Sequence, residues 1–571
     1  MPVVTLTIDK QEVQVEPGTS VLEAAKKANV NIPTLCYLKD LMAAGACGVC
    51  VVEVQGKAEP VKSCQTVVEE GMVVSTYNAT IRDARREALE TILAKHPFEC
   101  LTCIRSLNCE LQEMAAVYGI REVTAVGAVS DYPADFSSVS VIRNPAKCIQ
   151  CQRCVAVCEK VQTVEALSVQ QDGKLVAPVK GQLADTNCVN CGQCVLVCPT
   201  AAIQERDQTE EVWAAIADPN KHVIVQTAPA VRVAIGEAFG LAPGSVATGQ
   251  MVAALRLIGF DKVFDTDFTA DLTIMEEGSE LLERVSKGGV LPLITSCSPG
   301  WIKFIEHFYP QLLPHVSTCK SPQQMFGALA KTFYAEKSGI DAKDIFSVSI
   351  MPCTAKKFEA QRPEMNSSGY QDVDVVLTTR ELARMFKLAG IDFSKLPEEN
   401  YDDPLGISTG AAVIFGATGG VMEAALRTVY EIVTKEDLPS VDFNEVRGLT
   451  GIKEATVQVG DLPVKVAVAH SLGNARKLLD AIVDGKADYH FIEVMCCPGG
   501  CIGGGGQPIP TNLEIRGKRI DGIYAADVDL PMRKSHENPA VQQLYVDFLE
   551  QPLGHKSHEL LHTHYTPRGK N

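Results

Sequence analysis

The chain has 571 residues, a hydrophobic content of 46% and a formal net charge of −17 at pH 7. This length is too great for one core, so we expect three or more domains, and the acidity speaks against a nucleic-acid partner. No run of about 18 apolar residues is present to span a membrane, and the N-terminus lacks the layout of a signal peptide. We therefore expect a cytoplasmic protein, in which the 21 cysteines indicate metal binding rather than structural disulfides.

Residues 1–16 alternate with period two and predict a β-hairpin, and SVLEAAKKANV after it predicts a helix capped by Thr19 or Ser20. Two strands, a helix and a glycine-rich cysteine loop resemble the β-grasp ferredoxins. The order of the next four cysteines approximates the plant-type [2Fe–2S] pattern with a longer first gap: Cys36, Cys47, Cys50 and Cys64. A zinc site on the same thiolates is the alternative. The loop composition and the hairpin frame favour the [2Fe–2S] cluster.

The next ligand group contains a histidine. A stretch with a helical pattern, residues 80–96, leads into His96, Cys100, Cys103 and Cys109. One imidazole and three thiolates bind zinc or a [4Fe–4S] cluster, and alone the motif favours zinc. Its place between two ferredoxin-like segments favours the cluster, because a redox-silent zinc ion would interrupt an electron path. A histidine ligand removes one negative charge and is expected to raise the reduction potential of the cluster.

Residues 148–158 and 188–198 form an internal repeat, each with the spacing C-x2-C-x2-C-x3-C of bacterial ferredoxins that hold two [4Fe–4S] clusters. In this arrangement the fourth cysteine of each run serves the other cluster. We therefore expect one cluster on Cys148, Cys151, Cys154 and Cys198. The other is expected on Cys188, Cys191, Cys194 and Cys158. The exchange of ligands makes the folding of each run depend on the other.

From about residue 209 the pattern changes to alternating strands and helices. HVIVQTAP and VLPLITS predict strands, whereas TGQMVAALRLIGF and SPQQMFGALAKTFYAEKSG predict helices. The alternation indicates an α/β domain with mainly parallel strands, which places ligands in the loops at strand ends. The tail from about residue 510 predicts helices separated by polar and proline-containing connections, and we expect it to be an accessory wrap.

Three segments at expected strand–loop junctions contain most of the remaining cysteines: ITSCSPGW (294–301), MPCTAKKFE (351–359) and EVMCCPGGCIGGGGQP (493–508). Together with the earlier ligand groups they resemble the [FeFe]-hydrogenases of the large modular form with four accessory clusters, over essentially the whole chain. The set is also similar to the catalytic subunits of NAD-linked, electron-bifurcating hydrogenases.

This resemblance implies a multidomain α+β and α/β fold with five domains. They are a β-grasp [2Fe–2S] ferredoxin domain (1–79), a small His/Cys3 [4Fe–4S] domain (80–138), a bacterial ferredoxin domain with two [4Fe–4S] clusters (139–208), an α/β H-cluster domain (209–509) and a C-terminal helical wrap like a small subunit (510–571).

The resemblance further implies an H-cluster, in which a [4Fe–4S] cubane shares one thiolate with a diiron unit that carries CO, cyanide and an azadithiolate. By matching position, Cys353, Cys497 and Cys501 are its ligands, and Cys501 is the bridge. The glycines around Cys501 agree with this reading, because they let the backbone approach a bulky inorganic group. Lys356 is placed to donate to a cyanide, and the thioethers of Met351 and Met495 would form a soft apolar wall.

One position departs from the family pattern. Two adjacent cysteines usually precede Pro-Gly-Trp, the first a proton carrier and the second a cubane ligand, but here the pair is Cys297 and Ser298. Conversely, Cys496 stands where the usual pattern has alanine. The fourth ligand is therefore open among Ser298 as an alkoxide, Cys297 after a small backbone shift, and Cys496.

The family pattern also implies a proton relay of Cys297, Glu280, Ser317 and Glu277 with Arg284. A thiol can act as the last carrier, because it loses and regains a proton near neutral pH when its pKa is tuned. The alternative for the glutamates is a solvated helix face, since EEGSELLER (276–284) is acidic and has a helical pattern. We expect Cys319 to be a buried apolar thiol, and the tail histidines to lie on the surface: His555, His558, His562 and His564.

The resemblance implies an enzyme that catalyses 2H⁺ + 2e⁻ ⇌ H₂, with electrons relayed through three [4Fe–4S] clusters and one [2Fe–2S] cluster. Its expected partners are ferredoxin, NAD(H)-binding flavoprotein subunits in a hetero-oligomer, and maturation proteins for the diiron site. The alternatives are a redox or H₂ sensor without catalysis, and an electron-transfer or cluster-assembly protein on the same fold. Retention of Cys297, Lys356 and Cys501 favours the enzyme.

Overall fold

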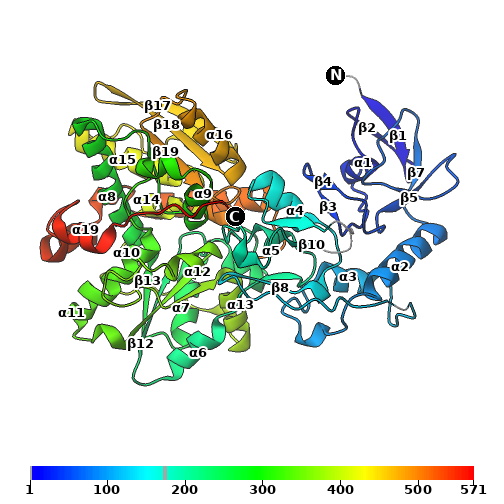
Figure 1. Cartoon of the computed structure of the whole chain (residues 1–571), viewed down its shortest axis with the longest axis horizontal. Coiled ribbons are helices and arrows are strands. Elements are labelled where there is room, and N and C mark those ends of the chain that lie inside the picture. Colours follow the sequence, from blue (N-terminus) through cyan, green and yellow to red (C-terminus); the bar gives the residue numbers. More distant parts are fainter. Residues whose placement is uncertain (1–2, 126, 171–175, 571) are drawn as a thin grey trace. The chain divides into compact units, whose positions relative to one another are not determined.

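The computed structural model describes residues 3–125, 127–170 and 176–570 (Figure 1). The chain divides into two compact units. The accessory unit comprises Met1–Lys160, Glu165–Thr186 and Val197–Gln204, and the catalytic unit comprises Val161–Val164, Asn187–Leu196 and Glu205–Asn571. The expected ferredoxin domain at 139–208 is thus shared between the two units. Within the described ranges, no helix is long and apolar enough to cross a membrane.

The accessory unit begins with a five-stranded sheet of order β2-β1-β7-β5-β6. Its strands are β1 (Val4–Ile8), β2 (Gln11–Val15), β5 (Val51–Val54), β6 (Val61–Lys62) and β7 (Val73–Ser75). β1 and β2 form the predicted hairpin, and β1 runs parallel to β7. Helix α1 (Val21–Lys27) packs its apolar face on this sheet and is capped by Ser20, whose Oγ accepts from the Glu23 amide at 3.3 Å. The hairpin, the helix and its cap confirm the β-grasp prediction.

The rest of the accessory unit consists of short elements. The predicted helix at 80–96 is α2 (Ala79–Leu93), which begins after the capping side chain of Asn78. The other elements are β3 (Tyr37–Leu38), β4 (Met42–Ala43), η1 (Cys100–Thr102), α3 (Glu110–Val117), β8 (Val141–Arg143), η2 (Pro145–Lys147), α4 (Arg153–Ala156), η3 (Val157–Val161), β9 (Leu167–Val169), β10 (Val176–Pro178), η4 (Leu183–Asp185) and β11 (Ile203–Glu205). Most of this part of the chain is loop, which lets its cysteines converge.

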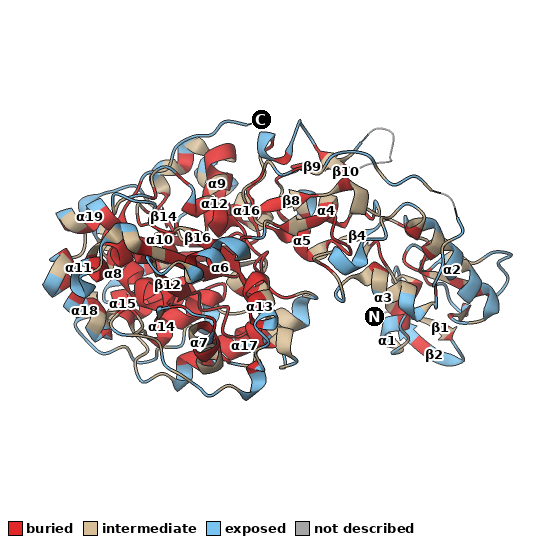
Figure 2. Cartoon of the chain, turned by 90° about the horizontal axis from the view of Figure 1, so that it is seen from below, coloured by how far each residue is buried: buried red, intermediate tan, exposed pale blue. Residues whose placement is uncertain are grey.

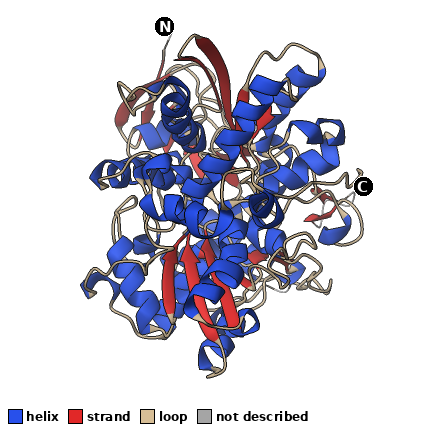
Figure 3. Ribbon diagram, turned by 90° about the vertical axis from the view of Figure 1, so that its left-hand side faces the viewer, coloured by secondary structure: helices blue, strands red, loops and turns tan. Residues whose placement is uncertain are grey.

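The catalytic unit contains a four-stranded parallel sheet of order β13-β12-β15-β16. Its strands are β12 (His222–Thr227), β13 (Lys262–Asp265), β15 (Ile345–Met351) and β16 (Val375–Thr378). They are almost entirely buried, and in Figure 3 helices lie around the sheet. Burial on both faces explains the continuous apolar runs of the sequence, and it confirms the parallel α/β prediction.

A second sheet has the order β14-β19-β18-β17. Its strands are β14 (Leu293–Ile294), β17 (Ile452–Val459), β18 (Leu462–His470) and β19 (Phe491–Met495). β14 and β18 are both parallel to β19, and β17 is antiparallel to β18. The strand predicted for VLPLITS is only two residues long, because the chain turns away after Ile294 to form the first cysteine loop.

Helix α8 (Thr266–Lys287) contributes to two apolar cores: Ala270, Ile274 and Leu281 to one, and Phe268 and Leu272 to another. Figure 2 shows that the residues of the catalytic unit around it are mostly buried. The predicted helix at 321–339 is divided into α10 (Pro322–Leu329), a π-helical turn η7 (Ala330–Tyr334) and α11 (Ala335–Ser338).

The other helices of the catalytic unit up to residue 503 are α5 (Gln193–Val197), α6 (Thr209–Ala217), η5 (Ile235–Phe239), α7 (Thr248–Leu257), α9 (Pro299–Phe308), η6 (Pro310–His315), η8 (Ala342–Asp344), α12 (Ala355–Ala360), α13 (Thr379–Leu388), η9 (Phe393–Lys395), α14 (Gly410–Val413), η10 (Ile414–Gly416), α15 (Gly420–Thr434), η11 (Asn444–Val446), α16 (Leu472–Val483) and η12 (Cys501–Gly503).

The tail forms α17 (Leu513–Asp529), η13 (Ser535–Glu537), α18 (Pro539–Leu544), η14 (Tyr545–Leu549) and α19 (His555–Leu561). Val541, Leu544, Leu560 and Leu561 pack in the same core as α8 and α10. The helical wrap is therefore as expected, but it covers the acidic helix that the sequence pattern alone left open to solvent.

Candidate active site and cluster-binding sites

The four cysteines of the first domain lie in two close pairs. The Cys36 and Cys47 sulfurs are 3.3 Å apart, and those of Cys50 and Cys64 are 3.4 Å apart. Two thiolates on one tetrahedral metal with bonds of about 2.3 Å lie about 3.8 Å apart. Hydrogen bonds from Cys36 and Cys64 lower the pKa of Cys47 to about 6 and that of Cys50 to about 7. The two pairs fit the two irons of a [2Fe–2S] cluster.

His96, Cys100, Cys103 and Cys109 line one cavity together with Lys147. Burial, with a contribution from Lys147, lowers the pKa of His96 to about 4, which keeps its imidazole neutral, the form that binds metal. Among the residues that the structure describes, the buried His96 Nδ1 has no hydrogen-bond partner. An orphaned nitrogen that faces three thiols fits the expected His/Cys3 ligand set.

The ligands expected for the first ferredoxin-like cluster also converge, since Cys148, Cys151, Cys154 and Cys198 line one cavity. Gln150 and Gln152 adopt left-handed backbone conformations, with φ of 57° and 65°, and Asn190 and Gly192 repeat this in the second run with 60° and 69°. The repeat in sequence is therefore also a repeat in backbone shape. Cys188, Cys191 and Cys194 belong to the catalytic unit and Cys158 to the accessory unit, so the second ligand set stays a prediction.

The three late cysteine segments meet at one cavity of about 70 Å³, the volume open to the centre of a water-sized sphere. Each segment follows the carboxyl end of a parallel strand, β14, β15 or β19, where α/β sheets bind their ligands. Its lining includes all the expected H-cluster residues and Cys496, namely Cys297, Ser298, Met351, Cys353, Lys356, Met495, Cys496, Cys497 and Cys501. The predicted constellation is thus brought together.

The glycine loop is shaped for close backbone approach. Gly500 has φ +92°, and a Cβ there would lie 2.7 Å from the Thr418 amide nitrogen. A Cβ at Gly504 would lie 2.2 Å from the Pro352 carbonyl oxygen. A side chain at either position would displace the backbone beside the cavity. A tight loop, soft sulfur donors and one cation fit an anionic iron–sulfur group at this site.

Lys356 is positioned from helix α12. Its Nζ donates to the Cys297 carbonyl oxygen at 3.1 Å and to Glu359 Oε2 at 2.8 Å. The same carboxylate oxygen accepts from Ser321 Oγ at 2.9 Å and from Gln323 Nε2 at 3.2 Å. Glu359 therefore orients the ammonium group. Sequence reasoning missed this role, although the three-residue spacing from Lys356 along a helix was a usable signal.

Ser298 and Cys496, the two positions that depart from the family pattern, are neighbours. The Cys496 amide donates to Ser298 Oγ at 3.2 Å. The Cys496 thiol makes side-chain contacts with Cys497 and with Cys191. Its carbonyl accepts from Gln162 Nε2 at 3.1 Å. Cys496 thus lies between a predicted accessory-cluster ligand and a predicted cubane ligand.

The expected relay residues are adjacent. Ser317 Oγ donates to Glu280 Oε2 at 2.9 Å and also contacts Glu277. Arg284 Nη2 donates to Glu280 Oε1 at 2.6 Å. Burial and the neighbouring Glu280 raise the pKa of Glu277 to about 8. Burial, Glu277 and Cys501 likewise raise the pKa of Cys297. The solvated-face alternative is wrong, because Glu276, Glu277 and Glu280 are all buried.

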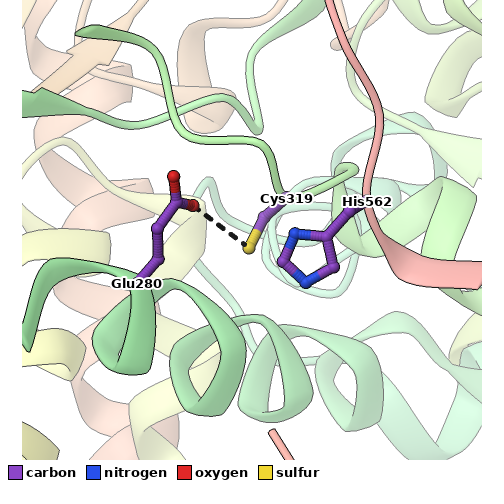
Figure 4. A group of neighbouring side chains, drawn as sticks. All are labelled: Glu280, Cys319 and His562. Atoms are coloured by element: carbon purple, nitrogen blue, oxygen red, sulfur yellow. Dashed lines mark hydrogen bonds between the residues drawn. The ribbon is translucent and has the colours of Figure 1, made fainter. Parts of the chain in front are cut away.

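The expectation for one tail histidine is wrong, whereas that for Cys319 is confirmed with a polar neighbour added. His562 is buried rather than on the surface, because it follows α19 into the core beside Glu276, where Nε2 is 3.1 Å from Oε2. Cys319 is buried as expected, but its sulfur faces Glu280 Oε2 at 4.0 Å (Figure 4). Glu280, Cys319 and His562 form a polar group that sequence reasoning did not assemble, because 243 to 282 residues separate His562 from the other two.

Comparison with known families agrees with this geometry along the chain. Residues 221–505 match the family described as iron only hydrogenase large subunit, C-terminal domain, and residues 513–568 match the family described as iron hydrogenase small subunit. The N-terminal matches are a 2Fe-2S iron-sulfur cluster binding domain (2–79), the NADH-ubiquinone oxidoreductase-G iron-sulfur binding region (85–124) and a 4Fe-4S dicluster domain (147–202).

Individual proteins agree as well. The chain is 53% identical to the NADP-reducing hydrogenase subunit HndD of Solidesulfovibrio fructosivorans over 100% of both chains. It is 41% identical to iron hydrogenase 1 of Clostridium pasteurianum, over 98% of this chain and 99% of the relative. A solved apo [FeFe]-hydrogenase variant from Chlamydomonas reinhardtii superimposes with a TM-score of 0.58 and 46% identity, over 64% of this chain and 100% of that one. The chain belongs to the iron-only hydrogenases, with domains for an H-cluster and for 2Fe-2S and 4Fe-4S clusters.

Proposed function

We propose that this hydrogenase interconverts protons and H₂ at the cavity around Cys297 and Cys501, and exchanges electrons through four accessory clusters with ferredoxin and an NAD(P)(H)-linked flavoprotein subunit. The observation that carries the proposal is the convergence of soft sulfur ligands and one lysine at one cavity, with the buried Glu277 near enough to raise the pKa of Cys297. A full-length relative named as a subunit of an NADP-reducing hydrogenase supports a hetero-oligomeric complex, which we propose to be electron-bifurcating.

The bound H-cluster supplies the electrons and the metal position at which protons and H₂ interconvert. Cys353, Cys497 and Cys501 would hold it, and Lys356, oriented by Glu359, would neutralise its negative charge. Met351 and Met495 form a buried apolar wall that limits water. The protein's own contribution is therefore to hold the group, balance its charge and deliver protons.

Cys297 would exchange the proton with Glu277. Glu277 and Cys501 are near enough to raise the pKa of its thiol, and its carbonyl oxygen accepts from Lys356 Nζ at 3.1 Å. A pKa near 8 keeps Glu277 protonated at neutral pH, so it is ready to give a proton. Ser317, which contacts both glutamates, would pass the proton between Glu277 and Glu280. These contacts favour Cys297 as a carrier over Cys297 as a cubane ligand.

We further propose that Cys496 supplies the fourth cubane thiolate in place of Ser298. Its side chain lines the cavity and contacts that of Cys497, while the Ser298 hydroxyl is occupied by the Cys496 amide. A thiolate is a far better ligand for iron than a serine hydroxyl at neutral pH. The contact of Cys496 with Cys191 would also give electrons a short path from the accessory cluster.

Two variants test the ligand assignment without using turnover. Cys496→Ala is expected to lose the cubane's electron paramagnetic resonance signal and about four irons per chain, as one cubane holds four. In the double variant with Ser298→Cys, which restores the usual ligand position, the signal is expected to return. A full cubane signal in Cys496→Ala alone would contradict the assignment.

The catalytic proposal is tested on the matured full-length protein with reduced methyl viologen as electron donor. Hydrogen evolution, and viologen reduction under H₂, are the expected results. Electron partners are tested separately by mixing the protein with reduced ferredoxin or with a flavoprotein subunit and NADPH. Viologen-driven turnover without response to either partner would contradict the partner assignment alone. A sensor or electron-transfer protein would give no hydrogen with any donor.

A further inference from the structure

Arg284, at the outer end of the expected relay, is not suited to releasing protons. Arg284, the last member, donates from Nη1 to the Pro314 carbonyl oxygen at 3.0 Å, and from Nη2 to the Val316 carbonyl oxygen at 3.1 Å and to Glu280 Oε1 at 2.6 Å. A guanidinium stays protonated at all physiological pH values. Arg284 therefore fixes Glu280 but does not carry its proton to solvent.

Thr318 joins Glu280 to a different group. Its amide and its Oγ1 lie 3.1 and 3.3 Å from Glu280 Oε2, and both donate to it. The same hydroxyl is 2.8 Å from His562 Nδ1. A hydroxyl between a carboxylate and an imidazole accepts a proton on one side as it gives one on the other. The contacts thus extend from the relay to the C-terminal segment.

His562 is placed between this hydroxyl and a second glutamate. Its Nε2 is 3.1 Å from Glu276 Oε2, and Glu276 also accepts from Tyr545 Oη at 2.6 Å and from the Leu553 amide at 2.8 Å. Burial alone would raise the pKa of Glu276, but the hydrogen bonds from His562, Tyr545 and Leu553 lower it below its ordinary value. A buried carboxylate held as an anion stabilises an imidazolium beside it.

A second histidine, which is exposed, lies beside His562. The rings of His562 and His558 have centroids 4.5 Å apart, and His558 is exposed on α19. The charged and titratable groups that face the His562 ring come from α8, the Ser317–Cys319 loop, η14 and α19: Glu276, Glu280, Cys319, Tyr545 and His558.

A metal ion is a weaker explanation of this group. Ligand atoms of Glu280, Cys319 and His562 lie within 4.8 Å of one another (Figure 4). However, both nitrogens of His562 have hydrogen-bond partners, and both oxygens of Glu280 already accept from protein donors. A metal would have to displace these bonds. The hydrogen bonds from Glu280 through Thr318 to His562 fit a proton path instead.

We propose that Thr318 and His562 carry protons between Glu280 and the surface beside the exposed His558, and we call these two residues the histidine outlet. This proposal rests on the proposed function of the relay. In each step an O–H or N–H bond breaks as another forms. The Glu280 carboxyl gives its proton to the Thr318 hydroxyl, which gives its own to His562 Nδ1. The imidazolium ring then turns, which breaks its bond to Thr318, and releases that proton toward the exposed His558 and solvent. No electron moves, and Glu276 stays ionised to hold the imidazolium.

Variants of the full-length matured enzyme test the outlet. His562→Gln and Thr318→Val are expected to lower viologen-driven hydrogen evolution roughly ten- to hundredfold, with a larger solvent deuterium isotope effect. Thr318→Ser keeps the hydroxyl and is expected to retain the parent rate. His555→Gln, at an exposed position of the same helix as His558, is the matched control and is expected to change nothing. Infrared bands and iron content should be unchanged in all four.

Rescue separates a proton role from a structural one. Added imidazole is expected to restore part of the rate in His562→Gly, and none in Cys297→Ala. Parent rates and pH profiles in both His562→Gln and Thr318→Val, with Cys297→Ala inactive, would overturn the outlet and leave the proposed function intact. If the parent enzyme itself evolves no hydrogen, the proposed function has failed first.

Discussion

The accessory and catalytic units place their cysteines in different surroundings. In the accessory unit the [2Fe–2S] thiols lie in pairs 3.3 and 3.4 Å apart, and the His/Cys3 site reaches the surface at the exposed Cys100. In the catalytic unit the cysteines share a cavity with Lys356 and adjoin the buried Glu277. Electron transfer requires closely placed clusters, whereas proton chemistry also requires titratable groups in a chain. The surroundings of the cysteines therefore suit electron transfer in the accessory unit and proton chemistry in the catalytic unit.

Loss of the last proton carrier gives the largest expected effect. Cys297→Ala is expected to lower hydrogen evolution about 10²- to 10⁴-fold, because general acid–base groups contribute on that order. The cubane signal should persist, since Cys297 is proposed as a proton carrier and not as a ligand. Electron paramagnetic resonance of the purified variant checks this. A missing cubane would instead make Cys297 a ligand.

Glu277→Gln gives the next largest effect, a loss of about 10²-fold in turnover. It also tests the buried acid through stability. Because the pKa of Glu277 is about 8 when folded and near 4.5 when unfolded, only the unfolded state loses this proton as pH rises from 4.5 toward 8. Stability from this group therefore falls over that window, by on the order of a few kcal/mol.

Thermal melting of the parent and of Glu277→Gln at pH 5 and pH 8 measures this contribution. The parent is expected to lose more stability between the two pH values than the variant, which has no proton to release. The matched control is Glu283→Gln, at an exposed position of the same helix, which should melt like the parent at both pH values. Equal slopes in all three proteins would show that Glu277 ionises normally.

Cys64→Ser tests the wiring side of the comparison. The [2Fe–2S] signal is expected to disappear, because Cys64 and Cys50 form one of the two thiol pairs. Viologen-driven hydrogen evolution should remain close to the parent value, while turnover with ferredoxin or a flavoprotein partner should fall. Equal losses with viologen and with the natural donors would show that the two units are not separate in function.

His96→Cys gives the smallest expected effect. A thiolate adds one negative charge to the His/Cys3 cluster, so its reduction potential should fall, with little change in viologen-driven turnover. A redox titration followed by electron paramagnetic resonance measures the shift. An unchanged potential would show that His96, despite its orphaned Nδ1, is not a ligand.

Much of this was predictable because the signals are local. Alternation over residues 4–15 and the spacing of Cys148 to Cys158 each depend on neighbouring residues, and the structure confirms the hairpin and the convergence of the first ferredoxin-like ligand set. The residues that cover a helix can come from a distant part of the chain, and a local pattern does not reveal them. Glu276 on α8 is buried against Tyr545 and His562, which follow it by more than 250 residues, so the acidic face of the helix looked solvated from sequence.

Other contacts were out of reach for the same reason. The approach of Cys496 to Cys191 and the burial of His562 beside Glu276 join segments hundreds of residues apart. Glu359 is different, since its helical spacing from Lys356 was visible in MPCTAKKFE. Sequence periodicity reveals partners on one helix but not partners brought together by the fold.

The central claim is that the cavity around Cys297 and Cys501 holds the H-cluster. Infrared spectroscopy of the matured full-length protein tests it most directly, because CO and cyanide stretching bands lie where proteins do not absorb. The account predicts both sets of bands, and their loss on Cys501→Ala with the accessory signals intact. A fully iron-loaded protein without these bands would contradict it.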